Sequence, residues 1–375
     1  MTPVELSRTV LHAVRRAVDA GELSVTVPER AVVTPPGPGG CGDFATNIAL
    51  QLARAAGQPP RRVAEILRVR LLDEHRLADV VVTGPGFLNL SLEGTASADL
   101  VGEILSRGRR YGHGVGSSGT VVRLRCPAEV RAVVVADAIA RVRRSQGDVV
   151  RVHYDGPPAV EWTSALGVDA EDPRGPRTLV YSDSDSDSDS DVDVDLTVRP
   201  VPAPADPLPL GRDAARWALL YPAAHDRPRI TRDHLVQRET NPLFRVRYAH
   251  ARTRALLRNA ADLGFRPEPG PVRETPGPLR EKTPDPPRET DATALLALLG
   301  DHPRVLATAQ DTPDRLARHL VAVADATLPL LPAVLPLGEE KPSAAHRARL
   351  ALAEAAGAVL AGGLSLLGID APHHL

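Results

Sequence analysis

The sequence predicts three parts: an α+β N-terminal domain, a short βαβ (Rossmann-like) unit, and an all-α helical bundle at the C-terminal end. Helix and strand patterns alternate over residues 1–115, and a single strand, helix and strand follow in residues 116–160. From residue 210 onward, apolar side chains recur at helical spacing. Residues 161–209, rich in Pro, Asp and Ser, are expected to connect the last two parts.

Length and composition agree with several domains. The chain has 375 residues, of which 43% are hydrophobic and 3% aromatic, so Leu, Val and Ala must fill two or more cores. Its 36 Pro and 29 Gly indicate several connecting segments. Two cysteines, Cys41 and Cys126, have no metal-binding spacing and form no disulfide framework. The first residues favour a helix start over a signal peptide, so we expect a cytoplasmic protein with no membrane partner and no metal.

The N-terminal domain is expected to contain helices and strands of modest length. Its apolar stripes and its β-branched runs are each short, and a Gly-Pro-Gly turn separates the two clearest strands. The helices are expected near residues 6–17, 48–56 and 63–72, and the strands at residues 80–83 and 87–92.

The next region contains one βαβ unit. Strands are expected at residues 120–126 and 148–154, with a helix at about 128–146 that Gly147 ends. A parallel sheet needs further strands and cover on both faces, which the following residues do not obviously supply. We therefore interpret the unit as a structural joint.

Residues 161–209 are predicted to be a disordered acidic linker. A Ser-Asp alternation over residues 182–191 passes into Val-Asp repeats, which places seven Asp between residues 183 and 195. Mutual repulsion opposes compaction of such a segment, and it has little apolar surface to bury. A cation site is the alternative interpretation.

Charge is distributed unevenly along the chain. The net charge is +4 over residues 1–155, −9 over residues 156–210 and +3 over residues 211–375. In the predicted helix after residue 241 no acid interrupts residues 241–258, and an apolar face is expected to pack inward. The expected core positions are Val246, Ala249, Leu256, Leu257 and Ala260. Five arginines occupy the remaining faces, which fits either a solvated helix or a polyanion-binding one.

Ordered motifs resemble the arginyl-tRNA synthetase family. Gly42–Asn47 and Gly84–Asn89 resemble its N-terminal additional domain. Leu210–Trp217 is similar to its Gly-x-Asp-Ala-x-Arg segment, Asn241–Arg252 to its Asn-Pro…Tyr-Ala-His-Ala-Arg motif, and Gly363–Pro372 to its C-terminal signature. The resemblance spans the chain except for residues 156–209.

The resemblance implies an additional domain, a truncated nucleotide-binding core and a helical DALR anticodon-binding domain. It also implies tRNA as the partner, with an arginine tRNA as the first candidate. An aromatic ring can stack on an unpaired base, an amide can read a base edge, and arginines can hold phosphates. The alternative for each side chain is ordinary packing within the domain. The expected RNA-binding residues are Phe87, Asn89, Asn241, Arg245, Arg247, Tyr248, His250, Arg252 and Arg254.

Catalysis is not expected. The family holds ATP through a His-x-Gly-His sequence, and the matching residues 126–129 read Cys-Pro-Ala-Glu. The family's second catalytic loop needs lysines, whereas the only lysines are Lys282 and Lys341, both downstream of the Asn-Pro motif. The sequence therefore predicts a non-catalytic tRNA-binding protein with no cofactor. The alternatives are an active, ATP-dependent arginine–tRNA ligase with a degenerate core, and a protein-interaction scaffold.

Overall fold

A computed structural model describes most of the chain, and its residues form two compact units. The described residues are 3–34, 36, 44–73, 77–92, 94–168, 192–272 and 288–375. One unit comprises Met1–Gly108, Arg252–Asp301 and Asp325–Ala358; the other comprises Arg109–Ala251, His302–Ala324 and Val359–Leu375. Cys41, Gly42, Asp43 and Lys282 lie outside the described residues.

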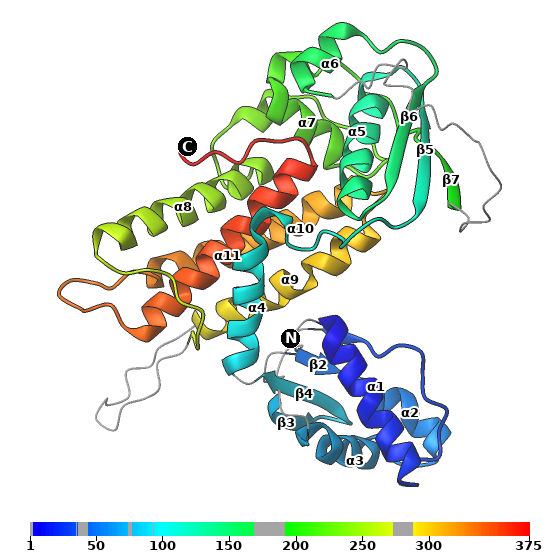
Figure 1. The fold of residues 1–375 in the computed structure, drawn as a ribbon, viewed down its shortest axis with the longest axis vertical. Helices are drawn as coiled ribbons and strands as arrows, with labels where there is room; N and C mark the ends of the chain where they lie inside the picture. The colour runs from blue at the N-terminus through cyan, green and yellow to red at the C-terminus, as the bar shows by residue number, and fades with distance from the viewer. Residues whose placement is uncertain are drawn as a thin grey trace, which may run out of the picture. The chain divides into compact units, whose positions relative to one another are not determined.

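The N-terminal domain is a four-stranded antiparallel sheet with helices (Figure 1). The strands lie in the order β1-β2-β4-β3, and β4 pairs with both β2 and β3. The strands are β1 (Val33–Thr34), β2 (Phe44–Thr46), β3 (Leu77–Thr83) and β4 (Phe87–Leu92). The helices are α1 (Pro3–Asp19), α2 (Ile48–Ala56), α3 (Pro60–Leu72) and α4 (Gly94–Arg107), followed by the 3₁₀ turn η1 (Gly108–Arg110).

The core of this domain follows the predicted apolar stripes. Leu6 and Val10 of α1 are fully buried, together with Leu67 of α3 and Leu88 of β4. The helices expected at residues 6–17, 48–56 and 63–72 and both expected strands are confirmed. The short strands β1 and β2 and the helix α4 were not predicted.

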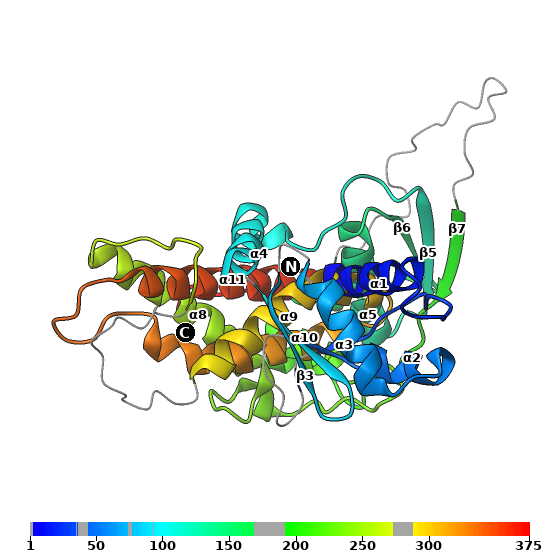
Figure 2. The same ribbon diagram turned by 90° about the horizontal axis from the view of Figure 1, so that it is seen from below.

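The second sheet is parallel and has three strands. Its elements are β5 (Thr120–Cys126), α5 (Val130–Ser145), β6 (Val149–Tyr154) and β7 (Val192–Thr197), and the strands lie side by side in the order β6-β5-β7 (Figures 1 and 2). The predicted strand, helix and strand are confirmed. The disordered linker expected at residues 161–209 is wrong at both of its described ends. Its first residues belong to α6 (Val160–Leu166), and Val192–Thr197 is a strand because the Val-Asp repeat is also a two-residue alternation. Residues 169–191 lie outside the described residues. Val194 and Leu196 are half-buried while Asp195 is exposed, as in a strand with one covered face.

Short helices connect this sheet to the C-terminal region: α6 (Val160–Leu166), η2 (Leu208–Leu210), α7 (Arg212–Leu220) and η3 (Arg232–Leu235). Arg216 of α7 links α5, α6 and the end of the C-terminal helix. The fully buried Arg216 guanidinium pairs with Asp137 of α5 at 2.5 Å. It also donates hydrogen bonds to the carbonyl oxygens of Leu166 at 3.0 Å and Leu367 at 2.7 Å. A buried charge is tolerated where it is paired and hydrogen-bonded, as it is here.

The C-terminal region is helical, as predicted. Its elements are α8 (Pro242–Asp262), α9 (Arg288–Thr308), α10 (Pro313–Thr327), η4 (Leu328–Ala333) and α11 (Ala344–Leu366). Of the predicted α8 core positions, Val246, Ala249, Leu256 and Ala260 are buried and Leu257 is half-buried. Helix α11 is long and apolar enough to cross a membrane, but 78% of its most apolar window is buried inside the protein. That degree of burial is typical of a core helix.

Candidate nucleic-acid interface

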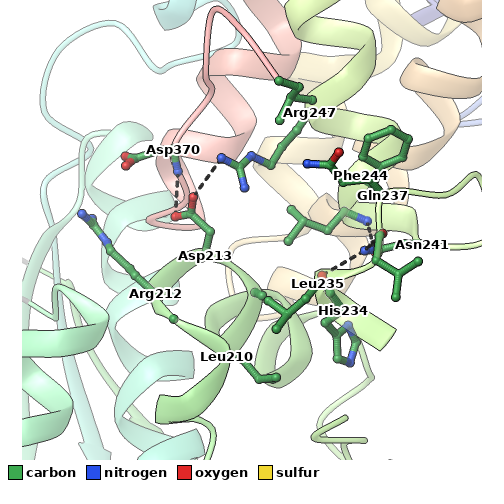
Figure 3. Close-up of a pocket in the computed structure, with 15 residues that line it drawn as sticks. Leu210, Arg212, Asp213, His234, Leu235, Gln237, Asn241, Phe244, Arg247 and Asp370 are labelled. Atoms are coloured by element: carbon green, nitrogen blue, oxygen red, sulfur yellow. Dashed lines mark hydrogen bonds and ion pairs between the residues drawn. The ribbon is translucent and has the colours of Figure 1, made fainter. Parts of the chain in front are cut away.

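Helix α8 begins at Asn241, whose side chain fixes the chain that precedes the helix. Its amide oxygen accepts a hydrogen bond from the backbone nitrogen of Leu243 at 3.1 Å, an N-cap interaction. Its amide nitrogen donates to the carbonyl oxygens of His234 and Val236, both at 2.9 Å (Figure 3). Asn241 is 6% exposed, and both of its amide hydrogens are used within the protein. Asn241 therefore caps α8, and the RNA contact expected from it stays a prediction.

An aromatic pair lies near the N-terminal end of α8. The rings of Phe244 and Tyr248 stack with centroids 5.4 Å apart and planes inclined by 20°. Tyr248 is 38% exposed, and Arg252 is exposed one turn further along. These three positions fall within about 80° of one another around the helix axis at ~100° per residue. The face therefore presents a stacked aromatic surface that ends at a guanidinium.

Further arginines flank this face on both sides. Arg245 lies on the side of Arg252 and is half-buried. On the other side, Arg247 forms an ion pair with Asp213 at 3.4 Å and its side chain is 25% exposed. Arg254 is also half-buried. Burial raises the pKa of the nearby Glu354, and the positive charge of Arg254 offsets part of that rise. Arg247 is thus partly engaged by a carboxylate, whereas Arg252 is the most accessible arginine of the predicted set.

His250 does not face solvent. It is 2% exposed, and its Nδ1 lies 2.9 Å from the carbonyl oxygen of Pro372, in the C-terminal signature. Its ring also contacts that of His373 at 6.0 Å. The structure agrees with the alternative of a histidine satisfied by a backbone carbonyl, and the RNA contact expected from His250 stays a prediction. His250 anchors the C-terminal segment to α8.

A cavity of about 330 Å³ lies beside the first turn of α8. Asp213 is at its wall, where it accepts a hydrogen bond from the backbone nitrogen of Asp370 at 3.2 Å and pairs with Arg247 (Figure 3). Phe244 and the C-terminal Leu375 also line the cavity. Sequence reasoning did not predict this cavity. Residues of three motifs that resemble the synthetase family line this cavity, namely Leu210–Trp217, Asn241–Arg252 and Gly363–Pro372. That shared resemblance was the only signal in the sequence that could have indicated the cavity.

The two candidates in the N-terminal domain differ from each other. Phe87 is 41% exposed at the start of β4, which agrees with a surface role. Asn89 is 2% exposed, and its amide nitrogen donates to Thr83 Oγ1 at 2.7 Å and to the carbonyl oxygen of Val81 at 3.3 Å. Asn89 therefore braces the β3–β4 hairpin, and the base-reading role expected of it stays a prediction.

The start of α5 is occupied by the protein's own side chains. Glu129 is its N-cap: one carboxylate oxygen accepts from the backbone nitrogen of Ala132 at 3.0 Å, and the other from Ala203 at 3.1 Å. Cys126, at the end of β5, is fully buried, and burial raises the pKa of its thiol to about 12. Neither side chain offers a positive charge to a phosphate, so the terminus carries a carboxylate instead of an anion site.

Arg131, two residues further along, is also directed inward. It is completely buried, and its guanidinium donates to the carbonyl oxygens of five residues at 2.7–3.1 Å. These acceptors belong to Val201, Leu219, Pro222, Ala223 and Asp226. Arg131 therefore holds Val201, the end of α7 and the turn that follows α7 against α5.

Two protein-family models match parts of this chain. The family described as "DALR anticodon binding domain" matches residues 246–375, and "Arginyl tRNA synthetase N terminal domain" matches residues 5–92. Among similar proteins, the arginine–tRNA ligase of Frankia alni is 38% identical over 164 residues, and that of Renibacterium salmoninarum 39% over 167. Each alignment covers 41% of this chain and 30% of the relative, so less than a third of each relative is matched.

Solved structures show the same fold. The arginyl-tRNA synthetase of Thermus thermophilus superposes with a TM-score of 0.62 at 15% identity, over all of both chains. That of Plasmodium falciparum gives 0.61 at 9% identity, over all of this chain and 99% of the other. The fold is therefore shared with these two structures. The chain carries one region that matches the N-terminal domain of arginyl-tRNA synthetases and one that matches the DALR anticodon-binding domain, and it spans about 30% of the length of the arginine–tRNA ligases it matches.

Proposed function

We propose that this protein binds tRNA through its helical domain and does not attach an amino acid to it. The observation that carries the proposal is the exposed face of α8, where Phe244, Tyr248 and Arg252 form one accessible row within a domain that matches an anticodon-binding family. An arginine tRNA is the first candidate ligand, because the relatives are named arginine–tRNA ligases.

The chemistry of this row suits an unpaired loop nucleotide. The exposed ring of Tyr248, already stacked on Phe244, can accept a base on its free face. Such stacking contributes about 1–3 kcal/mol per base. The guanidinium of Arg252, one helical turn away, can hold the adjoining phosphate through paired hydrogen bonds. Recognition would thus combine one aromatic and one cationic contact from the same face of α8.

The start of α5 supports the absence of adenylate formation. At this strand-to-helix junction the family's ATP-binding histidines and glycine are replaced, and the Glu129 carboxylate caps the helix. A carboxylate at that position repels a triphosphate and uses the backbone nitrogens that would otherwise bind it. Arg131 of the same helix donates hydrogen bonds to the carbonyl oxygens of Val201 and Asp226. The backbone next to the start of α5 therefore binds a side chain of the protein.

Binding is tested with a transcribed arginine tRNA and the full chain in a fluorescence anisotropy titration. Tyr248→Ala and Arg252→Ala are each expected to weaken binding roughly five- to a hundredfold, the effect of losing about 1–3 kcal/mol. Leu263→Ala is the matched control, since Leu263 is 54% exposed just beyond the end of α8. Unchanged affinity in both test variants would contradict the proposed site.

The absence of catalysis is tested by arginine-dependent exchange between ATP and pyrophosphate. We expect no exchange above the enzyme-free blank, with or without the arginine tRNA. Exchange that depends on arginine would instead establish the ligase alternative. A protein that recovers no RNA but does recover protein partners from cells would support the scaffold alternative.

A further inference from the structure

The parallel sheet carries basic side chains on the face that turns away from its buried side. Strand register places Arg123 of β5 beside Arg151 of β6, and Arg125 beside His153. Arg125, Arg151 and His153 are exposed and Arg123 is half-buried. We call these four residues the basic sheet face.

The alternation along the strands explains why these residues share one face. Val122, Leu124 and Cys126 of β5 are fully buried, and Val150 of β6 is 4% exposed. Because successive side chains of a strand point to opposite faces, the residues between them point outward. Parallel sheets are usually apolar on both faces because both are covered, so three arginines and a histidine at outward positions are unusual.

The positive charge of the basic sheet face is greatest between β5 and β6. Arg123 lies beside Arg151 on one side and beside Asp195 of β7 on the other, so the carboxylate offsets part of the repulsion between the two arginines. Arg125, Arg151 and His153, which lie further from Asp195, are exposed. An anion bound beside Arg125 and Arg151 would therefore meet positive charge from two strands.

Its spacing suits a chain of phosphates. Neighbouring strands lie about 4.8 Å apart, and alternate residues along one strand about 6.6 Å apart. The four side chains therefore form a compact block, and guanidinium groups match phosphate oxygens bidentately. On the other side of β5, Asp195 of β7 pairs in register with Arg123 and is exposed. The net positive charge consequently lies toward β6.

We propose that the basic sheet face binds the phosphate backbone of RNA, as a second contact surface in addition to α8. This inference rests on the proposed function for its ligand, a tRNA, but it concerns different residues. The contact reads no base, since arginine–phosphate contacts position a nucleic acid without specifying its sequence. It would add affinity and salt dependence to the loop recognition made by α8.

The test is the salt dependence of binding to the transcribed arginine tRNA, for the full chain between 50 and 300 mM KCl. Each phosphate contact contributes about −0.7 to −0.9 to the slope of log K against log salt. The double variant Arg125→Gln/Arg151→Gln is expected to flatten the slope by roughly 1.4–1.8 and to weaken binding roughly tenfold or more at 0.1 M salt. Arg15→Gln on α1, an exposed arginine off the sheet, should leave the slope unchanged.

A second variant is expected to act in the opposite direction. Asp195→Asn removes the negative charge beside Arg123 and should raise the affinity roughly two- to threefold, an effect that misfolding would not produce. An unchanged slope in the double variant, with Tyr248→Ala still weakening binding, would overturn this inference and leave the proposed function intact. A flattened slope with no effect of Tyr248→Ala would support the basic sheet face and overturn the α8 site. No tRNA binding by the wild-type chain would overturn both.

Discussion

Replacing Arg131 by Met is expected to destabilise the protein severely, because Arg131 supplies five hydrogen bonds inside a buried site. The substitution keeps the volume and apolar stem but leaves the carbonyl oxygens of residues such as Val201 and Leu219 without that donor. An unsatisfied buried acceptor costs about 1–3 kcal/mol, and the carbonyl of Ala223 retains a backbone partner in Asp226. Partial relaxation of the structure makes the total cost smaller than the sum over the individual carbonyl oxygens. Loss of one partner in a buried charged network typically costs about 3–5 kcal/mol.

We therefore expect a loss of about 4 kcal/mol, a large share of the ~5–15 kcal/mol that stabilises a typical domain. Urea denaturation followed by the fluorescence of the fully buried Trp217 measures it, since Trp217 lies in α7 near the Leu219 acceptor. Arg131→Lys, with three donors on its ammonium group, should be intermediate. Arg141→Met on the same helix, where Arg141 is 24% exposed and pairs with Asp137, should cost about 1 kcal/mol or less. A shift for Arg131→Met no larger than that of Arg141→Met would refute the reasoning.

Three further predictions concern stability and pH. Gly368→Ala should lower the thermal midpoint by more than Gly264→Ala does. Gly368 has φ of 70°, and a Cβ added there would meet the Arg216 guanidinium, whereas a Cβ added at Gly264 would meet nothing within 4 Å. Equal shifts of the midpoint would contradict this prediction. Asn89→Ala should lower the free energy of unfolding by about 1–2 kcal/mol in a denaturant titration. Phe87→Ala should leave the stability nearly unchanged and weaken tRNA binding. The reverse pattern would support Asn89 as the RNA contact. Burial, with smaller contributions from His319 and His113, lowers the pKa of His302. As the pH falls, this imidazole is therefore protonated in the unfolded chain before it is protonated in the folded protein. The free energy of unfolding should accordingly decrease as the pH drops below about 6.5. His302→Phe should flatten that dependence between about pH 5 and 7, and an equal slope in both proteins would argue against a buried neutral imidazole.

The elements with a clean local pattern were predictable from sequence. The helix expected at residues 48–56 matches α2 residue for residue, and the strand expected at residues 120–126 matches β5. In both, apolar periodicity and nearby glycines agree with the final packing. The strand Val192–Thr197 was predicted as part of a linker, because its several aspartates indicated disorder more strongly than the alternation of apolar and charged residues indicated a strand. Pairing with β5, which lies more than 60 residues earlier, makes that strand stable, and such a partner is not visible locally.

The candidate site was predicted only in part, for a related reason. Tyr248 and Arg252 are exposed as expected, since their positions on α8 lie away from its apolar stripe. Asn89 and His250 carry the side chains that a nucleotide contact needs, yet both are buried against backbone carbonyls. The partner of His250 lies 122 residues further along the chain. A residue type shows what a side chain can bind, but burial and long-range partners decide whether a ligand can reach it.

Ultraviolet crosslinking of the full chain to a transcribed arginine tRNA, followed by mass spectrometry of the linked peptides, tests the central claim most directly. Aromatic side chains stacked on bases crosslink readily, so the α8 peptide that contains Phe244 and Tyr248 is expected to carry the nucleotide. Crosslinks confined to peptides outside α8, in a complex that forms with full affinity, would contradict the claim that this helix receives an unpaired tRNA base.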